Sequence, residues 1–513
     1  MSLEVVYGAA HQRQLRQLAR NSVKIAAKLD LRVSAKKVLS ATASCYLGAV
    51  ERSESGGKDG ECKISGRVVT RVIYIDEFDA FNSEERTDNF TEKLVFKNHS
   101  SVISVSPAAI VLETSVADNS SGTSIDVDSI VEIAVMGLVS KEIKYATGFN
   151  CGAEAKLEKV MFTTFSKMVE ERFAADERIE LDKSCSGVLG VDVAAYIRDI
   201  DCNENRVSIK GCVCVNAITV KNNETQMISN SQHEFDFHKT ITVQGIGIDD
   251  TVIGNIAVGG VVIKADSKDK PELAVEVDLL FSGAAVSGRE IEHAADILSF
   301  DNHLGLTPAN IENIVCIPQN NVVVDIESNI TMPAKAPYIS KILAVSGSHI
   351  NSVNIMPADG KTTIEGVIAA SVVYECEEKQ IHTHAVQVPF NTVVKVEGVS
   401  AGHNIQVAVQ PINCHIKARR GKELLVDARL GISIAGMTVR TAQITGDIVL
   451  GEAKARDDSA IMIYIVQGKE TLWDVAKRIN VASVDIIKQN PQVASGVRSG
   501  DKIFIYRQNV ISF

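Results

Sequence analysis

Three apolar stretches of the chain share one pattern of positions and predict its main fold. Residues 64–75, 209–220 and 364–375 each begin Ile-x-Gly and continue as a run rich in β-branched and other apolar residues. β-branched side chains crowd a helix and fit a pleated sheet. A glycine early in a strand leaves room for a bulge or for another backbone to come close. We therefore predict that each stretch is the central strand of one β-rich domain.

The spacing of these stretches indicates a repeat of the size of a domain. Gly66, Gly211 and Gly366 are separated by 145 and 155 residues, whereas solenoid repeats have periods of about 20–50 residues. Other features recur in a constant order around each stretch. They are an upstream apolar pair (Val38-Leu39, Val188-Leu189, Ile342-Leu343), a downstream apolar run with a phenylalanine (Phe96, Phe237, Phe390) and a further β-type segment (125–135, 273–280, 424–434).

Two other segments space their apolar residues as a helix does. These residues are Leu15, Leu18, Val23 and Ile25 in segment 8–29, and Leu157, Val160, Met161, Phe165, Met168 and Phe173 in segment 153–173. The first pattern predicts an amphipathic helix, which packs on the first domain or docks on a partner. The second predicts a buried connector helix, although a strand is possible for part of it.

The C-terminal fifty residues have a different pattern. Residues 464–479 begin as a short strand and continue as a helix, with Thr471 at its N-cap and Asp474 as an acidic residue in its first turn. The buried stripe of this helix consists of Leu472, Val475, Ala476 and Ile479.

A second short helix and a closing strand complete this module. The pattern predicts a helix over 483–490, capped by Ser483 and stopped by Pro491. Residues 497–506 read as a turn followed by a strand. The predicted order is therefore β-α-α-β.

Together these patterns predict a mainly β protein with three tandem, sandwich-like β-rich domains and a small C-terminal module. A chain of 513 residues is long enough for three or four domains. The predicted limits are 1–29 for an N-terminal helical segment, 30–160, 161–310 and 311–455 for the three repeats, and 461–508 for the module.

Composition and charge narrow the functional classes. The net charge of −11 argues against nucleic acid as a general partner. No run of apolar residues reaches the ~18 that a transmembrane helix needs, and the N-terminal residues lack the pattern of a signal peptide.

Ten cysteines occur without a framework spacing. They predict small buried residues in a reducing compartment, and disulfides of a secreted protein are the alternative.

The sequence shows no convincing catalytic set. It has no P-loop, no Gly-x-Ser-x-Gly and no His-Glu-x-x-His. His382, His384, Cys414 and His415 are possible zinc ligands, but their spacing does not bring four ligands together. We therefore expect a protein that is not an enzyme and that has no cofactor and no metal. A cell-wall hydrolase with an unrecognised catalytic domain is the remaining enzymatic alternative.

The C-terminal module resembles a LysM domain. The matching residues are Tyr464, Val466, Thr471, Leu472, Trp473, Ala476, Asn490, Pro491, Gly500, Ile503 and Ile505. In LysM proteins, the loop before the first helix and the segment after Asn-Pro line a shallow groove for N-acetylated glycans. The resemblance therefore implies a groove for a glycan or a partner, made by Gly468, Lys469, Glu470, Thr471, Trp473, Asn490 and Pro491.

Two features of the module favour a protein ligand over a glycan. Where LysM domains usually have Gly-Asp, this chain has Lys469-Glu470, so a long cationic side chain stands at the tight position of the loop. Residues 461–507 contain seven basic and four acidic residues, a net charge of +3 on an acidic chain. A basic module could dock on an acidic protein surface, or the charges could form an ordinary solvated face.

The whole arrangement, three β-rich repeats followed by one LysM-like module, resembles the clostridial SPOCS–LysM spore-coat morphogenetic proteins, the SipL-like family. The repeat motif is clearest at 338–343, Tyr-Ile-Ser-Lys-Ile-Leu. The resemblance implies a scaffold in the mother-cell cytoplasm that binds, through its LysM module, the coat morphogenetic ATPase that polymerises on the forespore surface. The alternative is an anchor that binds peptidoglycan.

Overall fold

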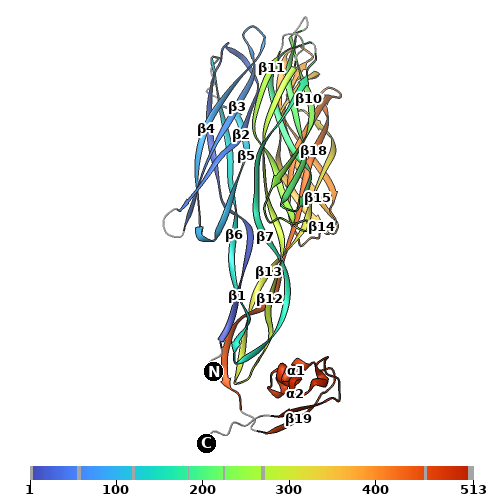
Figure 1. Cartoon of the computed structure of the whole chain (residues 1–513). Coiled ribbons are helices and arrows are strands. Elements are labelled where there is room, and N and C mark those ends of the chain that lie inside the picture. Colours follow the sequence, from blue (N-terminus) through green and yellow to red (C-terminus); the bar gives the residue numbers. More distant parts are fainter. Residues whose placement is uncertain are drawn as a thin grey trace.

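The computed structural model describes residues 4–54, 59–117, 122–182, 184–222, 226–266, 272–455 and 459–506. In this part of the chain, long antiparallel strands form three six-stranded repeats, and a small module with two helices follows them. Figure 1 shows the repeats side by side, with a narrow stem below them and the module at the end of the stem. The prediction of a mainly β protein is confirmed.

Each repeat has the same order of described strands. The first contains β1 (Glu4–Asp30), β2 (Ala35–Glu54), β3 (Gly60–Asp76), β4 (Phe81–Phe96), β5 (Val102–Val116) and β6 (Ser124–Cys151), with a 3-10 turn at His99–Ser101. The second contains β7 (Ala153–Glu180), β8 (Cys185–Asn203), β9 (Arg206–Asn222), β10 (Gln226–Thr242), β11 (Thr251–Asp266) and β12 (Glu272–Ser299). The third contains β13 (Asn302–Thr331), β14 (Ile339–Ala358), β15 (Lys361–Cys376), β16 (Ile381–Lys395), β17 (Asn404–Ala418) and β18 (Glu423–Ala453).

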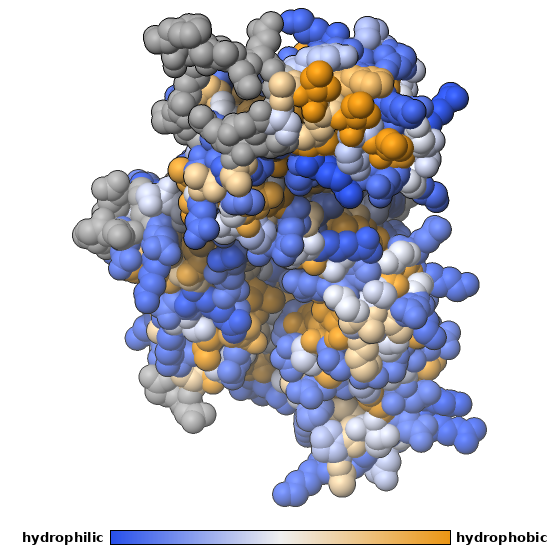
Figure 2. All heavy atoms as spheres, turned by 90° about the horizontal axis from the view of Figure 1, so that it is seen from below, coloured by the Kyte–Doolittle hydropathy of each residue, from blue (hydrophilic) through white to orange (hydrophobic). Residues whose placement is uncertain are grey.

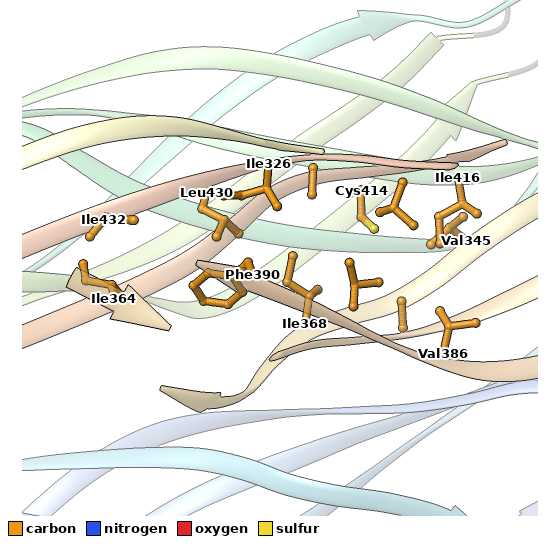
Figure 3. Packing of buried hydrophobic residues seen from close by; sticks show 14 of the residues in the cluster. Ile326, Val345, Ile364, Ile368, Val386, Phe390, Cys414, Ile416, Leu430 and Ile432 are labelled. Carbon is orange, nitrogen blue, oxygen red and sulfur yellow. The ribbon is translucent and has the colours of Figure 1, made fainter. Parts of the chain in front are cut away.

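The strands of a repeat pair into two three-stranded sheets. In the described residues these sheets have the orders β1-β6-β5 and β2-β3-β4, β11-β12-β7 and β10-β9-β8, and β13-β18-β17 and β14-β15-β16. Figure 3 shows the two sheets of the third repeat facing each other, with Leu430 and Ile432 of β18 opposite Ile364 and Phe390 of the other sheet. Each repeat is therefore a sandwich, and the predicted central strands β3, β9 and β15 lie in the middle of their sheets.

The glycine that marks each central strand has a specific structural role. Gly66, Gly211 and Gly366 lie opposite Phe90, Phe237 and Phe390 on the neighbouring strand. A Cβ on these glycines would stand 2.4, 2.3 and 2.5 Å from the ring of that phenylalanine. The aromatic ring therefore covers the glycine in all three repeats. In the first repeat, the phenylalanine equivalent to Phe237 and Phe390 is therefore Phe90, whereas the sequence pattern places Phe96 at that point of the repeat.

Both predicted helices are strands, and each of these strands contains a β-bulge. Segment 8–29 lies in β1, and segment 153–173 lies in β7. Leu18 is an extra residue in the pairing of β1 with β6, and Ser166 is an extra residue in the pairing of β7 with β12. A bulge shifts the alternation of faces by one residue. In a regular strand, residues on one face are two positions apart. The bulge in β1 instead gives Leu15 and Leu18 a spacing of three residues, which resembles that of a helix.

The strand limits also correct the predicted domain limits. The described repeats extend over 4–151, 153–299 and 302–453. The segment predicted as a separate N-terminal helix, 1–29, supplies the first strand of the first repeat, apart from residues 1–3, which lie outside the described residues. A division at 160/161 or at 310/311 would cut through β7 or β13.

A second set of bulges joins the three repeats. Leu39, Leu189 and Leu343 are each an extra residue in the pairing of β2, β8 and β14 with the central strand. These three leucines, which are 1%, 8% and 7% exposed, belong to one apolar cluster that also includes residues of β3, β9 and β15. The leucine of each apolar pair that the sequence repeats three times therefore contributes to a shared core between the repeats.

The long strands continue beyond the sandwiches into the stem. Its core receives side chains from all six long strands: Ala10, Ile143, Tyr145, Phe162, Ile291, Ile311 and Ile444. Hydrogen bonds also join the repeats there. The Arg13 amide donates to Thr164 Oγ1 (2.7 Å), and the Thr163 amide donates to Asn313 Oδ1 (2.8 Å). The stem is therefore a common structure of the three repeats.

Candidate functional site: the C-terminal module and its seat on the stem

The C-terminal module has the predicted β-α-α-β order. It consists of β19 (Ile461–Ile465), α1 (Leu472–Ile479), α2 (Ser483–Gln489), a 3-10 turn at Pro491–Val493 and β20 (Lys502–Tyr506). β19 and β20 pair antiparallel, with Ile463 opposite Phe504. The buried core contains Val466, Val475, Ala476, Ile479, Ile486, Val493, Ile503 and Ile505. Residues 507 and 508, the predicted end of the module, lie outside the described residues.

The first helix begins as predicted. Thr471 is its N-cap and forms a capping box with Asp474. The Thr471 amide donates to Asp474 Oδ2 (2.8 Å), and the Asp474 amide donates to Thr471 Oγ1 (3.2 Å). The hydrogen bond from the Thr471 amide lowers the pKa of Asp474. The loop before α1 is therefore fixed to the first turn of the helix.

The second helix begins differently from the prediction. Its N-cap is Ala482, and Ser483 is the first helical residue. The Ser483 amide donates to Glu154 Oε2 (2.8 Å), a residue of β7 in the stem. The carboxylate of another domain therefore accepts the hydrogen bond at this helix start, and Ser483 does not cap it.

Glu470 holds the loop of the predicted groove in place. Its carboxylate accepts hydrogen bonds from the Gln467 amide (2.8 Å) and the Tyr464 hydroxyl (2.9 Å), and it pairs with Arg478 (3.1 Å). The hydrogen bond from Gln467 is the main reason that the pKa of Glu470 is lowered. Gly468, at the turn of this loop, has a φ of 54°. Such a left-handed backbone favours glycine.

Asn490 also has a structural role inside the module. Its side chain is 1% exposed. The Nδ2 group donates to the Phe504 carbonyl (2.7 Å) and to the Ile486 carbonyl (3.1 Å), while Oδ1 accepts from the Phe504 amide (2.8 Å). Asn490 thus joins the end of α2 to β20, and its polar atoms are used within the module. The neighbouring Pro491 is exposed.

Trp473 contacts the stem. Its Nε1 donates to Asp296 Oδ2 of β12 (2.7 Å), and Lys477 Nζ donates to Asp296 Oδ1 (2.7 Å). Burial opposes the ionisation of Asp296, but the hydrogen bonds from Lys477 and Trp473 outweigh it, so its pKa is lowered. One carboxylate of the second repeat therefore accepts hydrogen bonds from an indole and an ammonium group of α1.

We call the contact of the module with the ends of β7 and β12 the seat. Further contacts contribute to it. Asn480 Nδ2 donates to the Phe300 carbonyl (2.8 Å), and Lys454 Nζ donates to Asn480 Oδ1 (2.9 Å). Leu298, which is 1% exposed, belongs to the apolar core of the module, and Phe300 packs against that core. The module thus shares its core with the stem.

The seat changes how the predicted groove residues can be interpreted. Gly468, Lys469, Thr471 and Pro491 are exposed, whereas Glu470, Trp473 and Asn490 serve internal contacts or the seat. A ligand in the seated module would therefore meet the exposed residues of this set. Their role in binding stays a prediction.

An exposed apolar face of the module was missed by the sequence analysis. On β19, Ile461, Ile463 and Ile465 are 59%, 58% and 52% exposed, and Tyr506, which pairs with Ile461, is 57% exposed. The alternating residues Met462 and Tyr464 pack against the core of the module. Figure 2 looks from below at the end that carries the module and shows hydrophobic side chains gathered on its surface. Both faces of β19 are apolar, so hydropathy could not distinguish the open face from the buried one.

Comparison with known proteins identifies the domain type of the third repeat. Residues 338–418 match the family model described as "SipL, SPOCS domain". This segment covers four of the six strands of the third sandwich, from β14 to β17. The match indicates a sporulation-related protein. No curated protein and no solved structure matches the chain significantly. Among the described residues, no helix has the length and apolar composition that crossing a membrane requires.

Proposed function

We propose that this protein is a non-enzymatic scaffold for spore-coat assembly, in which three SPOCS-like repeats hold a LysM-like module that binds another protein. The SPOCS match in residues 338–418 supports the link to sporulation. The first and second repeats have the same strand order and sheet pairing as the third, which supports the same domain type for them. The β-α-α-β order supports the LysM-like interpretation of the module.

The observation that carries this proposal is the open face of β19, defined as Ile461, Ile463, Ile465 and Tyr506. These four side chains are each more than half exposed and stand on one side of a two-stranded sheet. Exposed apolar groups that lie together often mark a protein interface. Lys502, opposite Ile465, is also exposed and adds a positive charge at the end of this face. A partner with an apolar centre and an acidic rim would fit.

The partner that the family resemblance implies is the coat morphogenetic ATPase of the forespore surface. Its encounter with this protein would take place in the mother-cell cytoplasm. The family resemblance implies this partner, and we propose that the open face of β19 is the surface that binds it.

A capture assay with the full chain and the purified ATPase tests the proposal. We expect Ile461→Ser with Ile465→Ser to reduce binding at least tenfold, because two exposed anchors of the open face are lost. Val484→Ser is the matched control, since Val484 is 69% exposed on α2, outside the open face. Equal binding by the wild-type chain and the double variant would refute the role of the open face.

Binding of peptidoglycan is the second candidate function. The exposed positions Gly468 and Thr471 favour it, because they leave one side of the loop accessible to a glycan, whereas the cationic side chain of Lys469 opposes it. Sedimentation with purified peptidoglycan distinguishes the two functions. The scaffold proposal predicts no retention of the full chain, whereas retention that is kept in the double isoleucine variant would support the anchor.

A further inference from the structure

Two buried cysteines and a glutamate meet between the second and third repeats. Cys212 and Cys214 lie on the same face of β9 and are 0% and 4% exposed. Glu234, on β10, is directly opposite Cys214. The ligand atoms of these three residues all lie within 4.8 Å of one another, and Cys212 Sγ is 4.0 Å from Glu234 Oε2.

The third repeat closes this cluster from the other side. Ile412 of β17 packs with Cys212, Cys214 and Tyr196 in one apolar cluster. A Cβ on Gly431 of β18 would stand 3.0 Å from the side chain of Tyr196, so this strand passes close to the cluster. The thiols are therefore enclosed by two repeats.

Glu234 divides its two oxygens between two partners. Oε1 accepts a hydrogen bond from Arg429 of β18 at 2.8 Å. Oε2 is the oxygen that faces Cys212. Arg429 therefore fixes the carboxylate with one oxygen toward the thiols.

Comparison of the repeats shows that the fold does not require thiols here. With the central glycines aligned, the first repeat has Arg67 and Val69 at these two positions, and the third has Val367 and Ala369. The position of Glu234 is occupied by Thr87 and Gln387, which lie opposite Val69 and Ala369. Among the three repeats, the ligand-type side chains thus occur together at these positions in the second repeat alone.

We propose that Cys212, Cys214 and Glu234 bind one zinc ion that links the second and third repeats. Two thiolates and a carboxylate are typical zinc ligands, and a tetrahedral site with Zn–S bonds of about 2.3 Å places its sulfurs about 3.8 Å apart. The cluster needs only a small closure to reach this geometry, and water completes the fourth position. The zinc ion and Arg429 together neutralise the three negative charges of the ligands.

Cobalt titration of the full chain tests this site. The protein is prepared without metal and with its thiols reduced, and Co²⁺ is then added. We expect thiolate-to-cobalt charge-transfer absorption and the visible bands of tetrahedral Co²⁺, which saturate at one ion per chain and disappear when Zn²⁺ is added. Cys202→Ser, at a half-buried cysteine of the same repeat, should keep these bands.

Two variants keep the result interpretable. Cys212→Val with Cys214→Ala copies the side chains of the third repeat, so it should fold and lose the cobalt bands. Glu234→Gln keeps the size of the side chain and should weaken zinc binding, because it replaces a carboxylate ligand with a neutral amide. Zinc should also raise the midpoint of thermal unfolding of the wild-type chain and not that of the double variant. Absence of thiolate bands in the folded wild-type chain, or equal bands in the double variant, would overturn the proposal.

Discussion

At the scale of single residues, the glycines of the central strands define the interior of each sandwich. Gly66, Gly211 and Gly366 each lie below a phenylalanine ring of the next strand. At Gly211 and Gly366 a Cβ would also come within 2.5 Å of a backbone carbonyl oxygen, that of Tyr196 or Ser352. A flexible side chain can move aside, whereas a backbone oxygen in a paired strand has little freedom. We infer that these positions tolerate only glycine.

We therefore expect Gly211→Ala to destabilise the second repeat by about 1–3 kcal/mol, the usual cost of forcing extra atoms into a packed core. The new Cβ would stand 2.3 Å from Phe237 and 2.4 Å from the Tyr196 carbonyl oxygen. The midpoint of urea unfolding measures this loss. Gly187→Ala is the control, because a Cβ there would meet no described atom within 4 Å. Similar midpoints for both variants would contradict this account.

At the scale of elements, the seat of the module depends on one carboxylate at the end of β12. Asp296 accepts hydrogen bonds from Trp473 and Lys477 of α1. Trp473 is the only tryptophan of the chain. Its fluorescence therefore reports directly whether the module is seated, without labels.

Protonation of Asp296 should release the seat. Its pKa is lowered in the folded protein, so the ionised form stabilises the seat at pH values above the ordinary aspartate pKa of about 3.9. This stabilisation is lost as the pH falls through the lowered pKa. We expect the emission of Trp473 to move to longer wavelength in that acidic range.

Asp296→Asn isolates this effect from general acid unfolding. The variant should show the longer-wavelength emission already at neutral pH, because the ion pair with Lys477 is lost. Asp485→Asn, on an exposed position of α2, should behave as the wild type. Unchanged emission of Asp296→Asn at neutral pH would show that the seat does not depend on the charge of this carboxylate.

The elements also show which features the sequence could predict. The central strands were recognisable because Ile-x-Gly followed by β-branched residues has few alternatives. The N-terminal strand was misread as a helix because the bulge at Leu18 gives its apolar residues a three-residue spacing. The seat could not be predicted, since Trp473 and Asp296 are 177 residues apart in the sequence. No local pattern connects two such residues.

At the scale of the whole molecule, two apolar clusters join the repeats. One contains the bulge leucines Leu39, Leu189 and Leu343, and the other forms the core of the stem. Hydrogen bonds support them. Ser40 and Ser346 share a buried hydrogen bond of 2.7 Å, and the Val345 amide donates to Asn230 Oδ1 (2.8 Å). We infer that the three repeats unfold as one cooperative unit.

Calorimetry tests this inference. The wild-type repeats should unfold in one main transition. Leu189→Ala removes a side chain that is 8% exposed in the shared cluster, and such truncations cost about 2–5 kcal/mol. Since this loss falls on the contacts between repeats, we expect the transition to broaden or divide. Val262→Ala, at a residue of β11 that is 50% exposed, should leave it unchanged. Separate transitions in the wild type would contradict the inference.

The direction of the long strands has a mechanical consequence. β18 reaches from the third sandwich through the stem and then leads into the module. A pull on the module, with the sandwiches held by neighbouring molecules, would load β18 along its own axis. Its ladder with β13 extends from Thr331 and Glu423 to Asn302 and Ala453. Bonds perpendicular to such a load share it and do not open one after another, so the protein should resist tension as a molecular tether.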